Sequence, residues 1–524
     1  MLGHTRAMMF GRSTAIIMFI AIASFETGRA AFAAPLAALP DDCAATVDKA
    51  KDLMQQQQMK AAQNMLQAAS TTCAKDAELF DTLGLAYAFD HHFDQAQVAY
   101  EKALTLEPGN AVIRNNLATD YLQSGQRAKG EAELQRVLKS DPHNVTANAN
   151  LGMLYLTDEK YPLAVRAFEA AGGATSRDAM LLMELAAAYL GAGNEQAGLR
   201  TAQRASEAAG PDPRIHYSLA IILAQAGEYE KALAEFQFIP PADLDAAAHL
   251  NLGMTYSKLQ RFDEARKAYL ESIREDTSNP DPYLHIGADA AATGDLATAA
   301  DWLTQAHEKA PERTEITAAL AQVQTATRNY ESAQTLLTEA LRMQPNDPAL
   351  QGALGALDLD QDKFSDAAAA YSRALKSVPG NIPMELMLVK CHLALNQNDK
   401  AEAELGEVMA ADPGNAEALA LRGRLALAAG QQDAALDWIR KALASDAHNL
   451  TANEDYAALM LKKGQAEEAR ATLVKLTGWN PSNPRYHYLL GQALAKTGDS
   501  AGAQKEFETS QKLKAAAAGV APAR

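Results

Sequence analysis

Apolar and polar residues alternate with helical spacing along most of the chain, and the pattern returns at a fixed interval. In residues 79–110, "LFDTLGLAYAFDHHFDQAQVAYEKALTLEPGN", leucines and tyrosines recur in two stretches that a polar turn, "FDHHFD", separates. A proline follows the second stretch. Apolar residues three to four apart lie on one face of an α-helix, so the segment predicts two amphipathic helices joined by a turn.

Small residues recur at the same interval as the helix pattern. The position of Gly84 is filled by Gly or Ala in twelve of thirteen successive segments, and each step is 34 residues except one of 33. The thirteen residues are Gly84, Ala118, Gly152, Ala186, Ala220, Gly253, Gly287, Ala321, Gly355, Val389, Gly423, Ala457 and Gly491. A second small register runs in phase from Ala96 to Ala503. Because small side chains let helix backbones approach closely, the two registers predict where the helices of each pair touch.

This pattern of Leu-Gly, Tyr, Ala, Tyr, Ala and Pro at a period of 34 resembles the tetratricopeptide repeat family. The resemblance implies an all-α fold, a right-handed α-solenoid superhelix of tandem helix-turn-helix units with a concave inner groove. One helix pair cannot bury its own apolar face, so the repeats must stack on one another. We number the repeats from a weak first one at residues 42–76, in which the first helix lacks the Leu-Gly pair.

Thirteen regular repeats then occupy residues 77–517. Their predicted first residues are Ala77, Ala111, Val145, Ala179, Pro213, Ala246, Pro280, Thr314, Pro348, Ile382, Ala416, Leu450 and Pro484. Residues 518–524 are expected to form a disordered tail. Glycines and proline pairs interrupt the pattern between residues 171 and 245, where a hinge or an ordinary loop would both fit.

Residues 1–33 have the composition of a secretory signal peptide, followed by a short linker at residues 34–41. Basic residues precede a short apolar run, "TAIIMFIAIA", and Ala31-Phe32-Ala33 forms a small-residue cleavage motif. We therefore expect an exported protein, periplasmic or secreted. The alternative is an uncleaved N-terminal anchor, and no later segment is apolar enough to span a bilayer.

The net charge of −17 is unfavourable for binding nucleic acid, where contacts to phosphates drive association. Protein or peptide partners are the expected class. Export also bears on the three cysteines, Cys43, Cys73 and Cys391. Cys43 opens the first helix of the weak repeat and Cys73 follows its second helix, so antiparallel packing predicts a Cys43–Cys73 disulfide. Cys391 is expected to be a buried, unreactive residue.

No catalytic motif is present: the chain has no phosphate-binding G-x-x-x-x-G-K-[ST], no G-x-G-x-x-G, no H-E-x-x-H and no paired C-x-x-C. His91 and His92 are adjacent in a turn but lack the further ligands that a metal ion needs. We therefore expect neither enzymatic activity, nor a cofactor, nor a metal. His216 and His249 occupy a packing position of the first helix.

The position just before the Leu of Leu-Gly is the candidate binding position. It holds Asn116, Asn150 and Asn251, and an asparagine amide pairs with both polar groups of a peptide backbone. In sugar-transferase relatives of the family, asparagines here form a peptide-binding ladder. Other repeats instead carry residues such as Ser218 and Leu421, so ordinary solvated polar residues are the alternative interpretation.

The sequence thus predicts a non-catalytic scaffold of a bacterial-type periplasm or cell envelope that binds proteins or peptides in a concave groove. The alternative is an accessory subunit of envelope polysaccharide synthesis or export. Direct sugar binding would favour a row of aromatic rings in the groove. However, Trp302, Trp438 and Trp479 all lie in or beyond predicted second helices.

Overall fold

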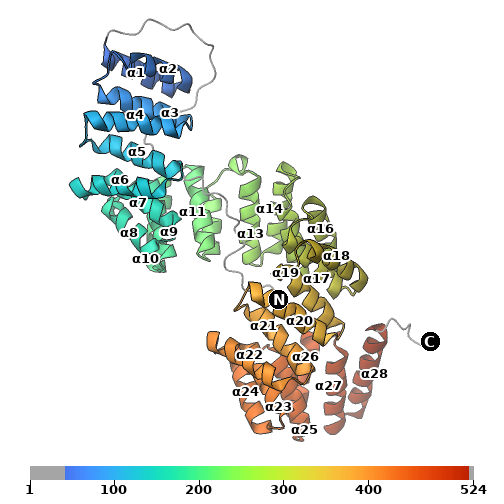
Figure 1. Ribbon diagram of the computed structural model, residues 1–524. Helices are drawn as coiled ribbons and strands as arrows, with labels where there is room; N and C mark the ends of the chain where they lie inside the picture. The colour runs from blue at the N-terminus through green and yellow to red at the C-terminus, as the bar shows by residue number, and fades with distance from the viewer. Residues whose placement is uncertain (1–41, 518–524) are drawn as a thin grey trace. The chain divides into compact units, whose positions relative to one another are not determined.

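The computed structural model describes residues 42–517, and every regular element in that range is helical (Figure 1). Twenty-eight α-helices and two single turns of 3-10 helix, η1 (Gly173–Thr175) and η2 (Pro241–Asp243), follow one another without a strand in these residues. The predicted all-α fold of tandem helix pairs is confirmed. The predicted signal peptide (1–33), linker (34–41) and tail (518–524) lie outside the described residues.

Each repeat contains a first and a second helix. The first helices are α1 (Cys43–Gln55), α3 (Ala77–Phe89), α5 (Ala111–Gln123), α7 (Val145–Thr157), α9 (Ala179–Gly191), α11 (Pro213–Gln225), α13 (Ala246–Lys258), α15 (Asp281–Ala292), α17 (Thr314–Ala326), α19 (Pro348–Asp360), α21 (Ile382–Ala394), α23 (Ala416–Ala428), α25 (Leu450–Lys462) and α27 (Pro484–Lys496). The second helices are α2 (Met59–Ala69), α4 (Phe93–Leu106), α6 (Arg127–Ser140), α8 (Tyr161–Ala170), α10 (Glu195–Ala209), α12 (Tyr229–Phe236), α14 (Phe262–Glu275), α16 (Leu296–Lys309), α18 (Tyr330–Met343), α20 (Phe364–Ser377), α22 (Asn398–Ala411), α24 (Gln432–Ser445), α26 (Ala466–Trp479) and α28 (Ser500–Ala517).

The chain divides into two compact bodies, an N-terminal body that ends at Glu275 and a C-terminal body that begins at Asp276. The irregular segments η1 and η2 both lie inside the N-terminal body. In each body, a second helix packs against its own first helix and against the first helix of the next repeat. Most consecutive first helices also pack against each other. First helices therefore form the inner layer of each stack, because the closely spaced layer of a curved stack lies on its concave side.

Side-chain caps explain where the first helices begin. The residue before the helix is Asp or Asn in most repeats, and its carboxylate or amide oxygen accepts a hydrogen bond from the first turn, as Asp76 does from the amide of Leu79 at 3.0 Å. The seventh regular repeat starts at Asp281, one residue after the predicted Pro280. The cap is nevertheless of the usual kind, because Asn279 accepts a hydrogen bond from the amide of Asp281 as Asp212 does from Arg214, where the helix begins at Pro213; the start therefore differs by one residue only.

In each repeat, the two helices pack most closely where a residue of the first helix meets one of the second helix. Counted from the first residue of a repeat, position 8 is the small residue and position 24 is a bulky residue of the second helix. A Cβ placed on Gly84 would lie 2.6 Å from the ring of Tyr100, which is 1% exposed. The aromatic pairs are Gly84–Tyr100, Gly152–Phe168, Gly253–Tyr269, Gly355–Tyr371 and Gly491–Phe507. Where position 8 is Ala, as at Ala118, position 24 is usually aliphatic, as at Leu134, although Ala220 faces Phe236.

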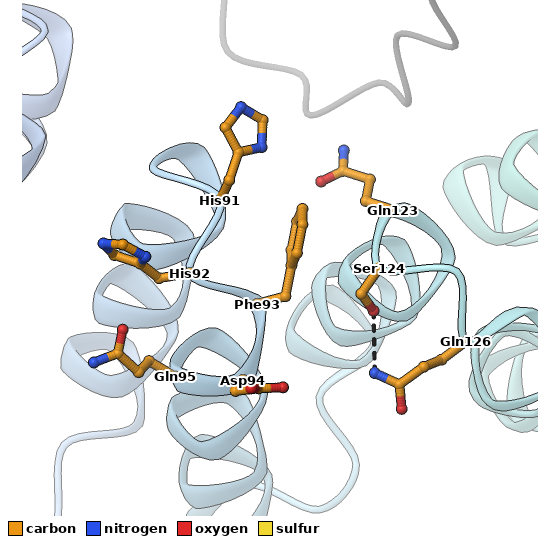
Figure 2. Close-up of a pocket in the computed structure, with 8 residues that line it drawn as sticks. All are labelled: His91, His92, Phe93, Asp94, Gln95, Gln123, Ser124 and Gln126. Atoms are coloured by element: carbon orange, nitrogen blue, oxygen red, sulfur yellow. Dashed lines mark hydrogen bonds between the residues drawn. The ribbon is translucent and has the colours of Figure 1, made fainter.

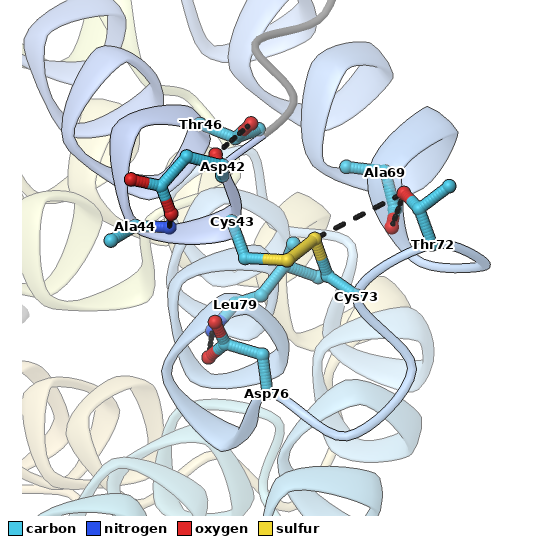
Figure 3. The surroundings of a disulfide bond; sticks show 9 residues. All are labelled: Asp42, Cys43, Ala44, Thr46, Ala69, Thr72, Cys73, Asp76 and Leu79. Carbon is cyan, nitrogen blue, oxygen red and sulfur yellow. Dashed lines mark hydrogen bonds between the residues drawn. A yellow bond between two sulfur atoms is a disulfide. The ribbon is translucent and has the colours of Figure 1, made fainter.

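The structure joins Cys43 and Cys73 in a disulfide, with Cα atoms 5.8 Å apart (Figure 3). The bond connects the first residue of α1 to the turn after α2, next to Asp76, which caps α3. Cys391 is buried in α21 and has no disulfide partner. The oxidation state of the cysteines in the cell stays a prediction, because it depends on the compartment.

We expect Gly84→Ala to loosen the second repeat, since the new Cβ would overlap the ring of Tyr100. The expected loss is about 1–3 kcal/mol of local stability. Amide hydrogen exchange of α3 and α4 measures it, because a long repeat array does not unfold in one step. Adding Tyr100→Leu copies the Ala118–Leu134 pair and should restore most of the protection. Unchanged exchange in Gly84→Ala would contradict the packing argument.

We expect one reactive thiol, that of Cys391, when the chain isolated from its native compartment is denatured without reductant and alkylated. Reduction should raise the number to three. Cys43→Ser should lower the stability of the first repeat by about 3 kcal/mol in the chain-entropy view of a disulfide, measured as faster hydrogen exchange in α1 and α2. Three thiols before reduction would show that the pair is not oxidised in the cell.

Candidate functional site

The three candidate asparagines lie on the inner layer, and each donates a hydrogen bond to the first helix of the preceding repeat. Asn116 bonds to Asp81 at 3.0 Å, Asn150 to the hydroxyl of Thr119 at 3.2 Å, and Asn251 to the hydroxyl of Tyr217 at 2.8 Å. These bonds link neighbouring repeats along the groove. The amide of Asn116 also matters electrostatically, because burial raises the pKa of Asp81 and this hydrogen bond opposes the rise.

The structure brings Asn116 and Asn150 into adjacent repeats and places Asn251 three repeats further along. Asn150 is only 2% exposed, so its side chain is engaged inside the protein. Asn116 and Asn251 are half-buried and each keeps an amide oxygen to which no hydrogen bond is assigned. A role for these three residues in peptide binding stays a prediction, and the geometry favours Asn116 and Asn251 over Asn150.

Glu184 occupies the same position in α9, one repeat after Asn150, and the sequence reasoning missed it. Its side chain is half-buried, and burial raises its pKa from 4.5 to about 7. Among the described residues it has neither a hydrogen bond nor an ion pair. The signal that would have found it was available: the position that holds asparagine in three repeats holds a carboxylate here.

The inner layer of the C-terminal body is charged and internally paired. Lys390 contacts Glu417 at 2.8 Å, Arg424 contacts Asp455 at 2.9 Å, and Arg485 contacts Glu454 at 2.6 Å. Each pair joins one first helix to the next. Because the carboxylates already have cationic partners, these pairs connect repeats in the same manner as the asparagine bonds of the N-terminal body.

An open pocket of about 620 Å³ lies between the turns of the second and third repeats (Figure 2). It is lined by His91, His92, Phe93, Asp94, Gln95, Gln123, Ser124 and Gln126. Figure 2 shows Ser124 and Gln126 joined by a hydrogen bond, with Phe93 on the opposite turn. The lining holds amides, imidazoles, a carboxylate and a ring. It offers hydrogen bonds, but it lacks the nucleophile-and-base pair of a hydrolytic site.

A buried carboxylate lies next to the pocket wall. Gln97 donates hydrogen bonds to Asp120 at 2.8 Å and to Ser124 at 3.3 Å, so the wall is tied to Asp120. Asp120 is 1% exposed, and its second oxygen has no partner among the described residues. Burial raises the pKa of Asp120 from 3.8 to about 6, and the nearby charge of Asp94 adds to the rise.

Neither the histidine pair nor the free cysteine forms a reactive centre. Within residues 42–517 no group of three or more His, Cys, Asp or Glu side chains is arranged to hold a metal ion, and the one carboxylate that His92 contacts is that of Asp90, at 3.2 Å. Burial raises the pKa of the Cys391 thiol to about 11, which keeps it protonated. His216 is 1% exposed and bonds to Glu235 and to the carbonyl of Gly210.

Comparison with known families agrees with this geometry. A family model described as "Tetratricopeptide repeat" matches residues 90–154, 290–357, 358–425 and 426–493, about half of the chain. The chain belongs to the tetratricopeptide repeat family. Three further models with the same description match residues 246–279, 183–243 and 484–516. Tetratricopeptide repeat proteins generally bind protein partners and are generally non-catalytic, so the chain has the architecture of a protein-interaction scaffold.

Individual relatives are distant and partial. The chain is 25% identical over 202 residues to the BBSome complex member BBS4 of Bos taurus, covering 38% of each protein. It is 23% identical over 201 residues to Superkiller protein 3 of Schizosaccharomyces pombe, covering 37% of this chain and 14% of that protein. The chain thus spans well under half the length of either relative.

Solved structures of similar architecture share still less sequence. The APC/C hetero-tetramer Cut9-Hcn1 has 13% identity and a TM-score of 0.46, covering 88% of this chain and 92% of that chain. Yeast Tom70 has 16% identity and a TM-score of 0.42, covering 82% and 96%. Among residues 42–517, no helix is both long and apolar enough to cross a membrane.

We expect Asp120→Asn to stabilise the second and third repeats at neutral pH. The folded-state pKa of about 6 lies above the ordinary 3.8, so the wild type loses stability as pH rises from about 4 to about 6, and the amide has no such dependence. The expected gain above about pH 7 is about 1–3 kcal/mol. Hydrogen exchange of α5, relative to wild type at each pH, measures it.

Asp94→Asn is the companion variant: Asp94 is exposed, so its replacement should change stability by less than about 0.5 kcal/mol, and because its charge adds to the raised pKa of Asp120 it should lower that pKa only slightly. If the difference in α5 hydrogen exchange between Asp120→Asn and the wild type is the same at pH 4 and at neutral pH, the buried carboxylate does not titrate in this range.

Proposed function

We propose that this protein is an exported, non-catalytic scaffold that binds a protein or peptide partner on the inner layer of its first helices. The observation that carries the proposal is this layer itself. In the N-terminal body, consecutive first helices pack side by side and present half-buried polar and apolar side chains to one face. Such a face matches an extended or helical segment of a partner, which contributes side chains at helical or strand spacing.

Membership of the repeat family supports a protein partner as the ligand class. The cattle relative is by its name a member of a multi-protein complex. A bacterial-type periplasm or cell envelope is the proposed location, based on the signal-like residues 1–33 and on a cysteine pair placed for oxidation. Intact mass of the native protein would report whether cleavage follows Ala33.

The alternative role, in envelope polysaccharide synthesis or export, has less support. Trp302, Trp438 and Trp479 lie on α16, α24 and α26, which are second helices. The inner layer of the described residues therefore has no tryptophan for a sugar ring to stack on. A polysaccharide machine is the alternative setting of the scaffold, reached through protein contacts.

We expect Ala187→Arg to block partner binding, because Ala187 is half-buried on α9, three residues after Glu184, and a long charged side chain there would occupy the inner face. Peptides selected from a random display library on the full chain are the probe. Their affinity for Ala187→Arg should fall about tenfold or more. Fluorescence polarisation measures it.

Gln203→Arg adds the same side chain at an exposed position of α10, a second helix, and should leave affinity unchanged. Asn116→Ala combined with Asn251→Ala tests the asparagine prediction separately. If selected peptides bind both arginine variants equally well, the binding face is not the inner layer of this repeat. If no peptide is selected, the scaffold has no short-peptide site.

A further inference from the structure

The inner face around α9 carries apolar side chains before and after one carboxylate, Glu184, whose own position holds Asn150 in α7 and Ser218 in α11. On α9 itself, Met180 precedes Glu184 by four residues and Ala187 follows it by three, so all three share a helix face. On the preceding first helix, α7, the same face carries Met153, and on the following one, α11, it carries Ile221. These apolar side chains are half-buried rather than buried. Methionine-rich surfaces of this kind adapt to varied apolar side chains of a partner.

Glu184 is the one carboxylate at this level of the face, and nothing in the described residues neutralises it. Burial alone raises its pKa to about 7. Several charged groups on or beside the helices packed against α9 are engaged elsewhere, and neither Arg166 on α8 nor Arg200 on α10 has a hydrogen bond or ion pair with Glu184. Arg204 donates to the carbonyls of Ala174 and Ser176, and the remaining pairs are Glu169 with Tyr189, Arg214 with Asp212, and Glu235 with His216.

Three other inner-layer carboxylates have partners. Asp81 accepts from Asn116, Glu417 contacts Lys390, and Asp455 contacts Arg424. A partly desolvated carboxylate without a partner is unfavourable in the free protein, and a cation placed beside it removes the penalty. Apolar side chains on either side exclude water from such a contact and so strengthen it.

We propose that Glu184 anchors a lysine or arginine side chain of a peptide segment whose neighbouring apolar residues pack on Met153, Met180 and Ile221. This inference rests on the proposed function and narrows it to one chemical class of partner, a basic residue flanked by apolar ones. The occupant is chosen by charge complementarity: an acidic segment would place like charges together, and a neutral segment would leave the carboxylate unpaired.

The anchor has a pH signature whose sign follows from linkage. In the free protein Glu184 is largely protonated below its pKa of about 7 and ionised above it. A bound cation favours the ionised form, so binding releases a proton near neutral pH and tightens as pH rises from about 6 to about 8. The basic side chain itself stays charged over that range.

Two pools of short acetylated and amidated peptides test the inference on the full chain. Both pools carry the same degenerate apolar flanks, and they differ only at the central residue, which is lysine in one and glutamine in the other. Wild type should bind the lysine pool about tenfold more tightly near pH 8, and the difference should shrink near pH 6. Calorimetry in buffers of different ionisation enthalpy should detect proton release.

Glu184→Gln should abolish both the preference for lysine and the proton release. Glu195→Gln makes the same change at an exposed site on α10 and should preserve them. The pH series of the wild type gives the same answer without a substitution, so a folding defect in one variant does not decide the outcome.

Equal binding of the two pools by wild type, or a preference that survives Glu184→Gln, would overturn the anchor. If Ala187→Arg then still blocks both pools, the inner face binds peptides without this charge and the proposed function stands. Absence of binding by either pool would also contradict the proposed role of Glu184. The display selection, with Ala187→Arg and Gln203→Arg, then tests the proposed function independently.

Discussion

The stack of repeats depends on how closely two helices approach at one point. A bulky side chain of the second helix lies against a residue of the first helix that has little or no side chain, as Tyr100 does against Gly84. The distance between the two helices at this contact sets their crossing angle. The crossing angle in turn sets the surface that packs against the next pair. Five aromatic residues at this point face glycine, whereas Leu134 faces Ala118, so in these pairs a larger side chain on the second helix goes with a smaller one on the first.

A second recurrent contact holds each pair to the turn before it. Residue 4 of a repeat often donates a hydrogen bond to the carbonyl six residues earlier, in the turn after the preceding second helix. Arg114 donates to the carbonyl of Pro108, Asn148 to that of Pro142, and His487 contacts that of Pro481. Different side chains thus satisfy the same main-chain acceptor, which would otherwise be partly buried without a partner. Packing and hydrogen bonding together leave the opposite face of the first helix free to vary.

That division explains which features could be predicted from the sequence. The helix pairs were predictable because volume at Gly84 and capping at residues such as Asp76 act locally and repeat in phase. The hydrogen bonds of Asn116 and Asn251 were not, because their partners are set by the approach of neighbouring repeats. Glu184 was missed for a related reason. The sequence does not distinguish a solvated surface glutamate from a desolvated one, because the difference depends on the surrounding side chains.

The disulfide of the first repeat makes the two ends of the described array unequal in stability. A terminal repeat has a neighbour on one side only, so both ends of a linear array are its weakest points and loosen first. The Cys43–Cys73 bond holds one end closed, while α28 at the other end has only non-covalent contacts with α27. In oxidising surroundings, loosening would therefore start at the C-terminal end and progress towards the N-terminus. In reducing surroundings both ends would be open to proteases, so the same chain would have a shorter lifetime there than in oxidising surroundings.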